Sequence, residues 1–322
     1  WINYGLIPLL NLTVAFLISG FVVWLIGESP LDALSLLIQG ALGNGEGIGF
    51  TLYYATSFIF TGLSVAVAIH AGLFNIGSEG QAYLGGLGCA LVALALDRYV
   101  PWYVTMPIAV VGAGLFGAAW AFIPAFLQAK RGSHIVITTI MFNYIGAALM
   151  VYLLVHVLIV PGKMAPETRT FLEGGQLPKL GWVMQLFGAK LGAAPFNVSF
   201  IIALVVSYLV WLLVWRTKLG FEMRTLGVSP TAAAYAGIPY ARTVIIAMLL
   251  SGALAGMMAL NPVMGSSARL QVEFVGGAGF VGIAVSLMGR NHPLGIVVAA
   301  ILFGILYQGG DWISFEMPNI TR

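Results

Sequence analysis

The side chains that could carry acid–base or metal chemistry are few and widely spaced. The sequence has four histidines, His70, His134, His156 and His292, and a single cysteine, Cys89, which lies in an apolar run. It contains neither an HExxH motif nor two adjacent carboxylates. Catalysis needs a nucleophile beside a base, and a metal site needs ligands gathered at motif spacing. We therefore expect no enzyme activity, no metal site and no cofactor.

Glycine motifs that bind phosphates in other proteins do not fit their required context here. Gly277, Gly279 and Gly282 match GxGxxG, but the dinucleotide motif follows a buried strand in a βαβ unit. This copy instead opens an apolar run, so we interpret it as a helix break or a packing motif. The P-loop pattern GxxxxGK[ST] is absent from the sequence. The chain cannot hydrolyse ATP through a P-loop.

The elements that position these residues must lie in lipid. Of the 322 residues, 60% are hydrophobic and only 8% are charged, whereas about 25% are charged in an ordinary soluble domain. The mean hydropathy is +0.98. The net charge of +3 comes from scattered basic residues, so nucleic-acid binding has no support.

Apolar runs predict an all-α, polytopic membrane helix bundle that forms one transmembrane domain over residues 1–322. About 20 residues span a bilayer, and we expect nine spans, the eighth of them short. They cover residues 6–26, 50–70, 82–96, 103–127, 135–160, 196–215, 243–260, 279–288 and 294–308. Small-residue patterns such as Gly252-xxx-Gly256 predict close helix packing. The glycine-rich stretches 71–81 and 261–279 cannot face lipid as loops, so we expect interrupted helices there, buried or lining a cavity.

Basic residues divide evenly between the two sets of loops, and their position sets the predicted orientation. One set is Lys130, Arg131, Arg216, Lys218, Arg224, Arg242 and Arg290; the other is Arg98, Lys163, Arg169, Lys179, Lys190, Arg269 and Arg322. Pairs of the first set adjoin helix ends, where the positive-inside rule applies. We therefore expect residues 216–242 in the cytoplasm and residues 161–195 and Arg322 outside.

The cytoplasmic segment 216–242 contains the signals of a short capped helix. Ser229 suits an N-cap, Pro230 suits the first turn and Gly237 suits a left-handed C-terminal position. A helix of two turns is unstable alone in water. Its alanine face, Ala232 to Ala234 with Ala236, permits docking onto a partner. An ordinary linker helix is the alternative.

Candidates for a passage through the bundle are polar or aromatic residues in the interrupted segments. They are Phe74, Asn75, Ser78, Glu79, Gln81, Asn143, Gln271 and Glu273. Asparagine and glutamine also join helices by hydrogen bonds, so a packing role is the alternative for each. Glu79 is either a coupling group or an acidic residue favoured by a helix N-terminus.

Four segments resemble the integral-membrane permease subunits of bacterial ABC importers for branched-chain amino acids, simple sugars and nucleosides. They are AGLFNIGSEGQAYLGG, HIVITTIMFNYIG, GFEMRTLGVSPTAAAYAGI and GGAGFVGIAVSLMGRNHPLG. The sequence LFNIGSEGQ is most similar to the nucleoside-type branch, in which two different permeases pair. The match covers about residues 50–310.

The resemblance implies a permease of the bacterial inner membrane that moves a small polar solute by alternating access. Its partners would be a cytoplasmic ATP-binding subunit, a second permease, an external solute-binding protein and the lipid bilayer. The contact with the ATPase would comprise Gly220, Glu222, Arg224, Gly227, Pro230, Ala232, Ala233 and Gly237. Family members have a further C-terminal helix, so we expect ten spans in the full protein. A self-sufficient channel or secondary carrier is the alternative, and sugars or branched-chain amino acids are alternative substrates within the family.

Overall fold

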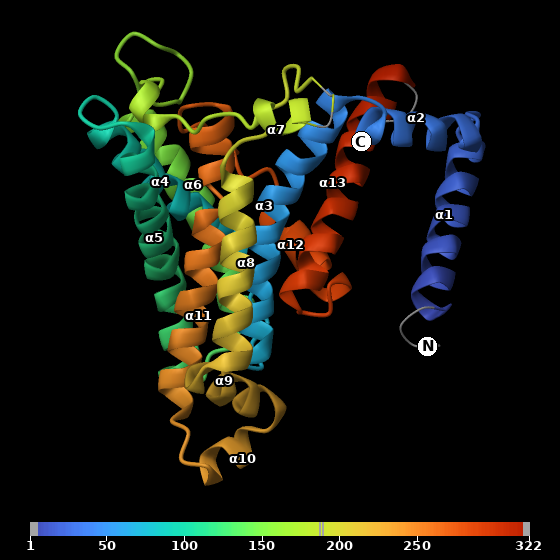
Figure 1. Cartoon of the computed structure of the whole chain (residues 1–322). Helices are drawn as coiled ribbons and strands as arrows, with labels where there is room; N and C mark the ends of the chain where they lie inside the picture. The colour runs from blue at the N-terminus through green and yellow to red at the C-terminus, as the bar shows by residue number, and fades with distance from the viewer. Residues whose placement is uncertain (1–5, 187, 189, 318–322) are drawn as a thin grey trace.

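The computed structural model describes residues 6–186, 188 and 190–317, and it is built of helices (Figure 1). In chain order they are α1 (Ile7–Leu25), α2 (Pro30–Leu42), α3 (Gly45–His70), α4 (Ser78–Leu96), α5 (Trp102–Arg131), α6 (Ile135–His156), the 3₁₀ turn η2 (Glu173–Gly175), α7 (Gly181–Leu186), α8 (Ser199–Arg216), α9 (Lys218–Val228), α10 (Pro230–Tyr235), α11 (Tyr240–Met257), the π-helical turn η3 (Leu260–Ser266), α12 (Ala278–Met288) and α13 (Pro293–Glu316). Over the described residues, strand pairing is limited to two isolated bridges. The all-α prediction is confirmed, and Arg322 lies outside the described residues.

The expected count of nine spans is slightly too high. Seven described helices are long and apolar enough to cross a bilayer, or eight if α1 and α2, which meet at a 115° bend, form one span. The predicted eighth span is α12, which has only 11 residues. It is short because the glycine-rich residues before it are not helical.

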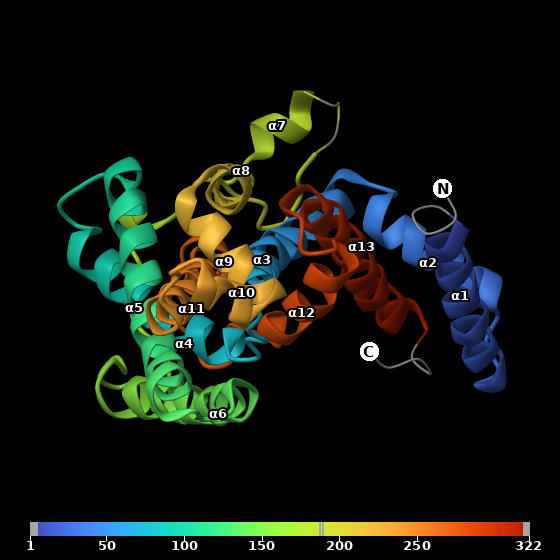
Figure 2. The ribbon, with the colours of Figure 1, turned by 90° about the horizontal axis from the view of Figure 1, so that it is seen from below.

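Helix α2, which follows α1, does not correspond to any of the predicted spans. Ser29 caps it by accepting a hydrogen bond from the Asp32 N–H, and Pro30 occupies its first position. It lies across the upper end of the bundle, while α1 stands apart from the other long helices (Figures 1 and 2). With 13 residues, α2 is too short to register as a span.

Glycines bring the central helices into backbone contact. Helix α11 packs on α3, α4 and α5. A Cβ atom on Gly256 would overlap the carbonyl oxygen of Ala113, and one on Gly85 would overlap Gly256 itself. Gly252 meets Gly117 in the same way. The close packing predicted from the small residues is confirmed.

Two non-helical stretches enter the bundle from opposite ends. Residues 71–77 leave the lower end of α3. Helix α4 then begins beside Ser64 of α3, as the distance of 3.2 Å between Ser78 Oγ and Ser64 Oγ shows. Ser64 stands six residues before the end of α3, or about 9 Å along the helix. Residues 267–277 leave the upper end of η3, and α12 begins beside Glu79 of α4. Helices α4 and α12 therefore both start inside the protein.

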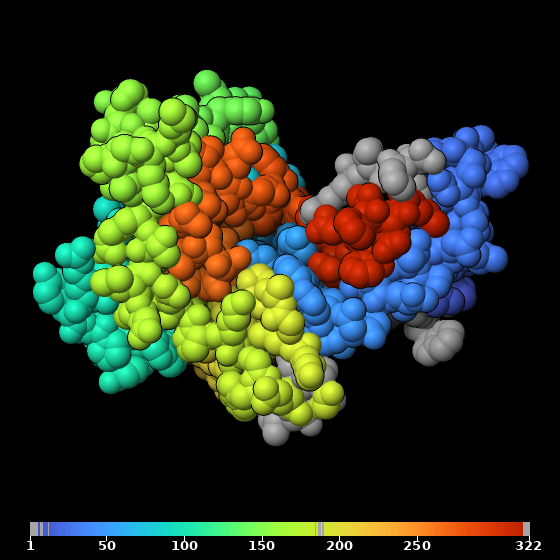
Figure 3. Space-filling model, turned by 90° about the horizontal axis from the view of Figure 1, so that it is seen from above, coloured from blue at the N-terminus to red at the C-terminus, as the bar shows by residue number. Residues whose placement is uncertain are grey.

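The two sets of loops lie at opposite ends of the bundle (Figure 1). Helices α9 and α10 form the lower end, and the segment between α6 and α8 forms much of the upper face (Figures 1 and 3). The segments 216–242 and 161–195 are thus on opposite sides.

Candidate functional site

Two amide side chains form the centre of a buried polar cluster between α3, α4 and α11. Asn75 Nδ2 donates to Gln81 Oε1 over 2.9 Å, and Gln81 Nε2 donates to Asn75 Oδ1 over 3.2 Å. Asn75 Nδ2 also donates to Ser251 Oγ at 2.8 Å, and its Oδ1 accepts from the Gly77 N–H. Both side chains are buried. In this arrangement their bonds are made within the protein, as in the packing alternative, and contact with a solute stays a prediction.

A chain of serine hydroxyls extends this cluster. Ser64 Oγ lies 3.0 Å from Ser251 Oγ and 3.2 Å from Ser78 Oγ, and the Ser251 hydroxyl donates to the Ser64 carbonyl. Ser78 was predicted from the sequence, whereas Ser64 and Ser251 were not. Each is a lone serine inside an apolar run, which is the signal that could have identified them. The hydroxyls join three helices without any charge.

Asn143 of α6 holds the break from the opposite side. Its Nδ2 donates to the Ile76 carbonyl at 2.8 Å, and its Oδ1 accepts from the Gly80 N–H at 2.8 Å. One side chain therefore satisfies two backbone groups that lipid could not. Gly80 has to be glycine because a Cβ there would crowd Asn143.

Glu79 connects the two interrupted segments. Its carboxylate accepts from the Gly277 N–H at 3.0 Å and from the Gly279 N–H at 2.8 Å, across the N-terminus of α12. These unpaired N–H groups and the helix dipole favour a negative charge. The helix-terminus role considered for Glu79 is therefore present, although the helix concerned is α12 as well as its own. Gly277 has φ of +79°, which starts α12 in a conformation that favours glycine.

The remaining candidates lie away from this cluster. Phe74 is partly exposed towards the lower end. Gln271 donates to Glu167 Oε2 at 3.2 Å near the upper end, where Glu273 is exposed with φ of +59°. The eight candidates therefore do not form one site: five surround the junction of α4 and α12, and three lie towards the two ends.

A second asparagine hub, which the sequence analysis missed, ties η3 to α3 and α8. Asn261 Oδ1 accepts from Asn197 Nδ2 at 2.9 Å and from Ser199 Oγ at 3.1 Å. Its Nδ2 donates to the Tyr53 carbonyl and to Ser57 Oγ. The pair Asn261-Pro262 at the end of an apolar run is the signal that could have identified this hub. This hub anchors the upper end of the second break.

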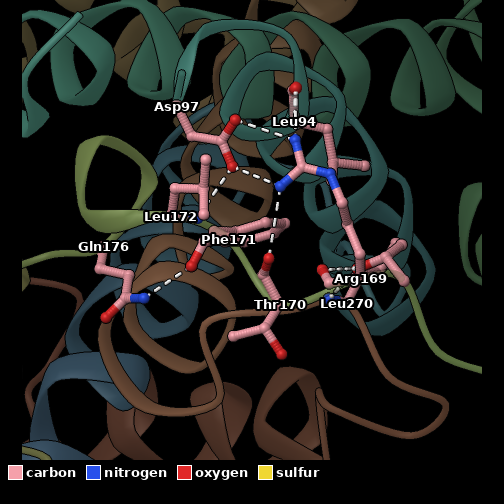
Figure 4. Close-up of polar contacts among 9 residues, drawn as sticks. Leu94, Asp97, Arg169, Thr170, Phe171, Leu172, Gln176 and Leu270 are labelled. Atoms are coloured by element: carbon pink, nitrogen blue, oxygen red, sulfur yellow. Dashed lines mark hydrogen bonds and ion pairs between the residues drawn. The ribbon is translucent and has the colours of Figure 1, made fainter.

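An ion pair fixes the upper segment to the end of α4 (Figure 4). Arg169 donates to both carboxylate oxygens of Asp97, at 2.6 and 2.9 Å, and to the Leu94 carbonyl at 3.0 Å. Burial raises the pKa of Asp97, but hydrogen bonds from Arg169 and the Leu172 N–H, with the charges of Arg169 and Arg98, outweigh it and hold the pKa below its ordinary value. The same pair raises the pKa of Arg169. Asp97 is therefore ionised over the neutral range.

Residues 167–177, which we call the strap, form backbone hydrogen bonds with the second interrupted segment, the upper break at residues 267–277. The Thr168 N–H donates to the Leu270 carbonyl, and the Phe171 N–H donates to the Ala268 carbonyl at 2.7 Å. Space-filling atoms of the strap region lie against those of the second break on the upper face (Figure 3). The strap thus links α4 to residues 267–271.

Glu167 adds charge to this contact. It pairs with Arg269 at 2.7 Å and with Lys163 at 3.3 Å. The hydrogen bond from Gln271, with those from Lys163 and Arg269, lowers the pKa of Glu167. Over the described part of the chain, His, Cys, Asp and Glu do not gather in groups of three or more that could hold a metal ion.

The capped helix at the lower end forms as its sequence signals indicate. Ser229 Oγ accepts from the Ala232 N–H, Pro230 is the first residue of α10, and Gly237 has φ of +73°. Helix α10 packs on α9 and α11, and α9 packs on α8, α11 and α3. Flanking structure therefore holds the short helix in place.

The expected coupling residues divide between inward and outward positions. Ala233 is only 1% exposed, so in this arrangement its methyl group contacts this chain, and a contact with the ATPase stays a prediction. A Cβ on Gly220 would overlap α8, and Gly227 packs against the start of residues 71–77. Glu222 lies 3.8 Å from Lys218, and Arg224 is half-buried. The outward group consists of Gly227, which is exposed despite that contact, and of Pro230, Ala232 and Gly237.

Large exposed side chains accompany that outward group, and the sequence analysis did not single them out. Val228 is 88% exposed and Tyr235 is 91% exposed. The underside of the bundle therefore presents apolar and aromatic groups beside small ones.

Comparisons with known proteins found one matching family and several relatives. Residues 47–321 match the family described as "Branched-chain amino acid transport system / permease component". The chain is 33% identical to the nucleoside ABC transporter permease protein NupB of Lactococcus lactis. The aligned region covers 98% of this chain and 87% of the relative. It is 33% identical to the guanosine ABC transporter permease protein NupP of Bacillus subtilis, with the same two coverages. It is 29% identical to the glucose ABC transporter permease protein TsgB13 of Haloferax volcanii, over 99% of this chain and 83% of the relative.

Proposed function

Because this chain belongs to the branched-chain amino acid transport permease family, we propose that it carries nucleosides across the membrane as a subunit of an ATP-driven ABC importer. Permeases of this family are membrane transport components and not enzymes, and the spanning helices make this one a multi-pass membrane protein. The observation that supports nucleosides as the substrate is the 33% identity, over nearly the whole chain, to two relatives named for nucleosides or guanosine. The neutral cluster of amides and hydroxyls around Asn75 supports it.

Glucose is the second candidate, because the relative named for glucose is 29% identical over 99% of this chain. A sugar and a nucleoside both lack net charge and both need hydrogen-bonding partners. The pathway residues proposed from the sequence are compatible with either. Transport measurements have to separate them.

The proposed complex has four kinds of component. A cytoplasmic ATP-binding subunit drives this permease and a second, different permease, and an external solute-binding protein delivers the solute. The decisive experiment reconstitutes this complex in proteoliposomes with ATP inside and labelled uridine or guanosine outside. ATP-dependent uptake that unlabelled nucleosides reduce, and that glucose and leucine do not, is the expected result. Uptake without ATP would identify a self-sufficient carrier, and reduction by glucose alone would make the substrate a sugar.

The proposed orientation puts residues 161–195 outside and residues 216–242 in the cytoplasm. Lys179 and Lys218 are both exposed and lie on these two segments. In a Cys89→Ala background, Lys179→Cys reacts with an impermeant maleimide in intact cells, and Lys218→Cys reacts only after permeabilisation. The reverse pattern would invert the topology.

The proposed contact with the ATPase is the outward face of α9 and α10. Exposure of Val228, Ala232 and Tyr235 supports this face, and the inward position of Ala233 moves the test to its neighbours. Tyr235→Asp places a carboxylate in a desolvated interface, which costs several kcal/mol when no partner pairs with it. Uptake is lost while the permease still folds. Met164→Asp, at a fully exposed position of the opposite end, is the matched control, and normal uptake in Tyr235→Asp would remove the coupling role.

A further inference from the structure

Two grooves flank the first turns of α13 towards the lower end of the bundle. One, of about 410 Å³, runs between α13 and α8. The other, of about 450 Å³, lies between α13 and the end of α12. Both grooves are lined by His292 and Leu294, so they meet at the start of α13. Their lining shares no residue with the polar cluster around Asn75 or with the coupling face of α9 and α10.

The walls of both grooves are apolar above this meeting point. Leu204 and Trp211 of α8 line the first groove with Val297 of α13. The second groove continues along α13 to Leu302, which lies about 14 Å along the helix from its first residue. Helices α8 and α13 are both long and apolar enough to cross a bilayer, and one leaflet contributes about 15 Å of hydrocarbon. The second groove therefore has about the length of an acyl chain in one leaflet, and the first starts at the same level.

Arginines lie at the lower mouth of this pair of grooves. Arg290 lines the second groove and is exposed. Arg216 ends α8, and its Cζ lies 5.3 Å from the ring centre of Trp211, which lines the first groove. The rings of His292 and Trp215 lie 5.0 Å apart, so the lower ends of α8 and α13 are in contact. The two arginines therefore approach the same turn from two helices.

Acidic side chains are scarce around these arginines. Asp and Glu do not contribute to the described lining of either groove. In segment 216–242 the only acidic residue is Glu222, which lies 3.8 Å from Lys218. A ligand that suits both grooves and their mouth has an anionic head and two apolar chains, one chain for each groove. A glycerophospholipid with a net negative charge has this form.

We propose that the two grooves bind one anionic glycerophospholipid of the adjacent leaflet, with its phosphate at Arg290 and Arg216 and its two acyl chains beside α13. Apolar grooves give little preference for one lipid over another, because all lipid tails are equally apolar. Selectivity comes from the headgroup, since each basic residue near the membrane surface attracts anionic lipid. The bound lipid links α8, which continues into the coupling segment, to the turn between α12 and α13.

The test uses the assembled complex, purified in a mild detergent and stripped of lipid. Tm is measured while dioleoyl phosphatidylglycerol or dioleoyl phosphatidylcholine is added, and native mass spectrometry counts the lipids that the complex retains. We expect phosphatidylglycerol to be retained and to raise Tm more than phosphatidylcholine, which has the same chains without a net charge. Inorganic phosphate at the same concentration gives no rise. A rise equal to that from phosphatidylglycerol would make this a site for free phosphate and would overturn the lipid assignment.

Substitutions separate the headgroup from the grooves. Arg290→Gln and Arg216→Gln each raise the phosphatidylglycerol concentration needed for half of the Tm rise about fivefold, the factor for one basic residue near an anionic lipid. Val297→Trp narrows the first groove and weakens the binding of both lipids alike. Arg131→Gln is the matched control, because Arg131 is exposed at the lower end of α5 and lines neither groove. It responds to both lipids as wild type does.

Three further results would overturn the proposal. Equal effects of the two lipids on Tm would remove the role of the headgroup. An equal loss in Arg131→Gln and Arg290→Gln would replace the site by a diffuse attraction to the whole lower end. A complex that retains no phosphatidylglycerol would show that another subunit covers the grooves. Because these measurements use neither nucleoside nor ATP, their failure leaves the proposed function standing, and an absence of nucleoside uptake leaves the lipid site standing.

Discussion

The lower and upper breaks in the helices pose the same physical problem and are held in different ways. In the lower break, residues 71–77, neutral side chains satisfy the backbone: Asn143 holds Ile76 and Gly80, and Asn75 holds Gly77. In the upper break, residues 267–277, the backbone is bound to the strap, and charged groups stabilise that contact. Glu79 joins the two.

The difference separates a buried neutral junction from an exposed charged one. Asn75 and Gln81 are buried, whereas Arg169 and Arg269 remain about one-third exposed. Salt and pH act on exposed ions and leave buried amides unaffected. We therefore expect the stability of the lower break to be independent of salt and pH, and that of the upper break to depend on them.

Removing the link between the two breaks has the largest expected effect. Glu79→Ala leaves the N–H groups of Gly277 and Gly279 without acceptors, and a hydrogen bond to a charged group contributes about 1.5–3 kcal/mol. We expect the complex to lose assembly or much of its thermal stability. Glu79→Gln keeps one acceptor oxygen and retains part of the stability. Tm measured by size-exclusion of heated samples ranks the variants, and equal values for wild type and Glu79→Ala would show that the link contributes nothing.

The next effect tests the neutral junction. Asn143→Ala leaves the buried Gly80 N–H and the partly buried Ile76 carbonyl unpaired, and an unpaired buried group costs about 1–3 kcal/mol. The loss of Tm is the same in 50 mM and 500 mM salt because no ion is involved. Asn11→Ala, on the exposed surface of α1, is the control. A salt-dependent loss would contradict the comparison.

The charged side gives a smaller effect that depends on pH. Arg169→Ala leaves the buried Asp97 carboxylate without its cation, which costs roughly 1–3 kcal/mol. The folded pKa of Asp97 is depressed, so its contribution is present above the unfolded value of about 3.9 and is lost as the pH falls through the folded value. Wild-type Tm is therefore insensitive to this group from pH 7 to 5. In Arg169→Ala the pKa rises, and protonation of Asp97 relieves part of the defect at mildly acidic pH. A Tm difference that stays constant down to pH 4 would count against this ion pair.

The smallest effect belongs to the outermost ion pair. Lys163 is 47% exposed and adds to a carboxylate that Arg269 already binds. Exposed pairs contribute little, so Lys163→Gln leaves Tm unchanged within error. A loss as large as that of Arg169→Ala would place the anchor of the strap at Lys163 and not at Asp97.

Much of the fold could be predicted because lipid imposes strong rules. Long apolar runs had to be helices, and Ser229, Pro230 and Gly237 had to cap one. The same rules do not specify what lies inside the bundle. Ser64 and Ser251 belong to helices that are distant in sequence, and their contact depends on how α3 and α11 pack together in the folded bundle. The direction in which Ala233 points also depends on tertiary packing, so its inward position could not be predicted.

The meeting of two helix starts at Glu79 has an electrostatic consequence. Each helix N-terminus carries about half a positive elementary charge, so the starts of α4 and α12 together carry roughly one, which an ionised Glu79 balances. A full charge that crosses the membrane exchanges about 2.3 kcal/mol with a potential of 100 mV. A neutral centre exchanges almost none. With Glu79 ionised, we expect rearrangements of this junction to do little work against the membrane potential, so that uptake depends little on voltage.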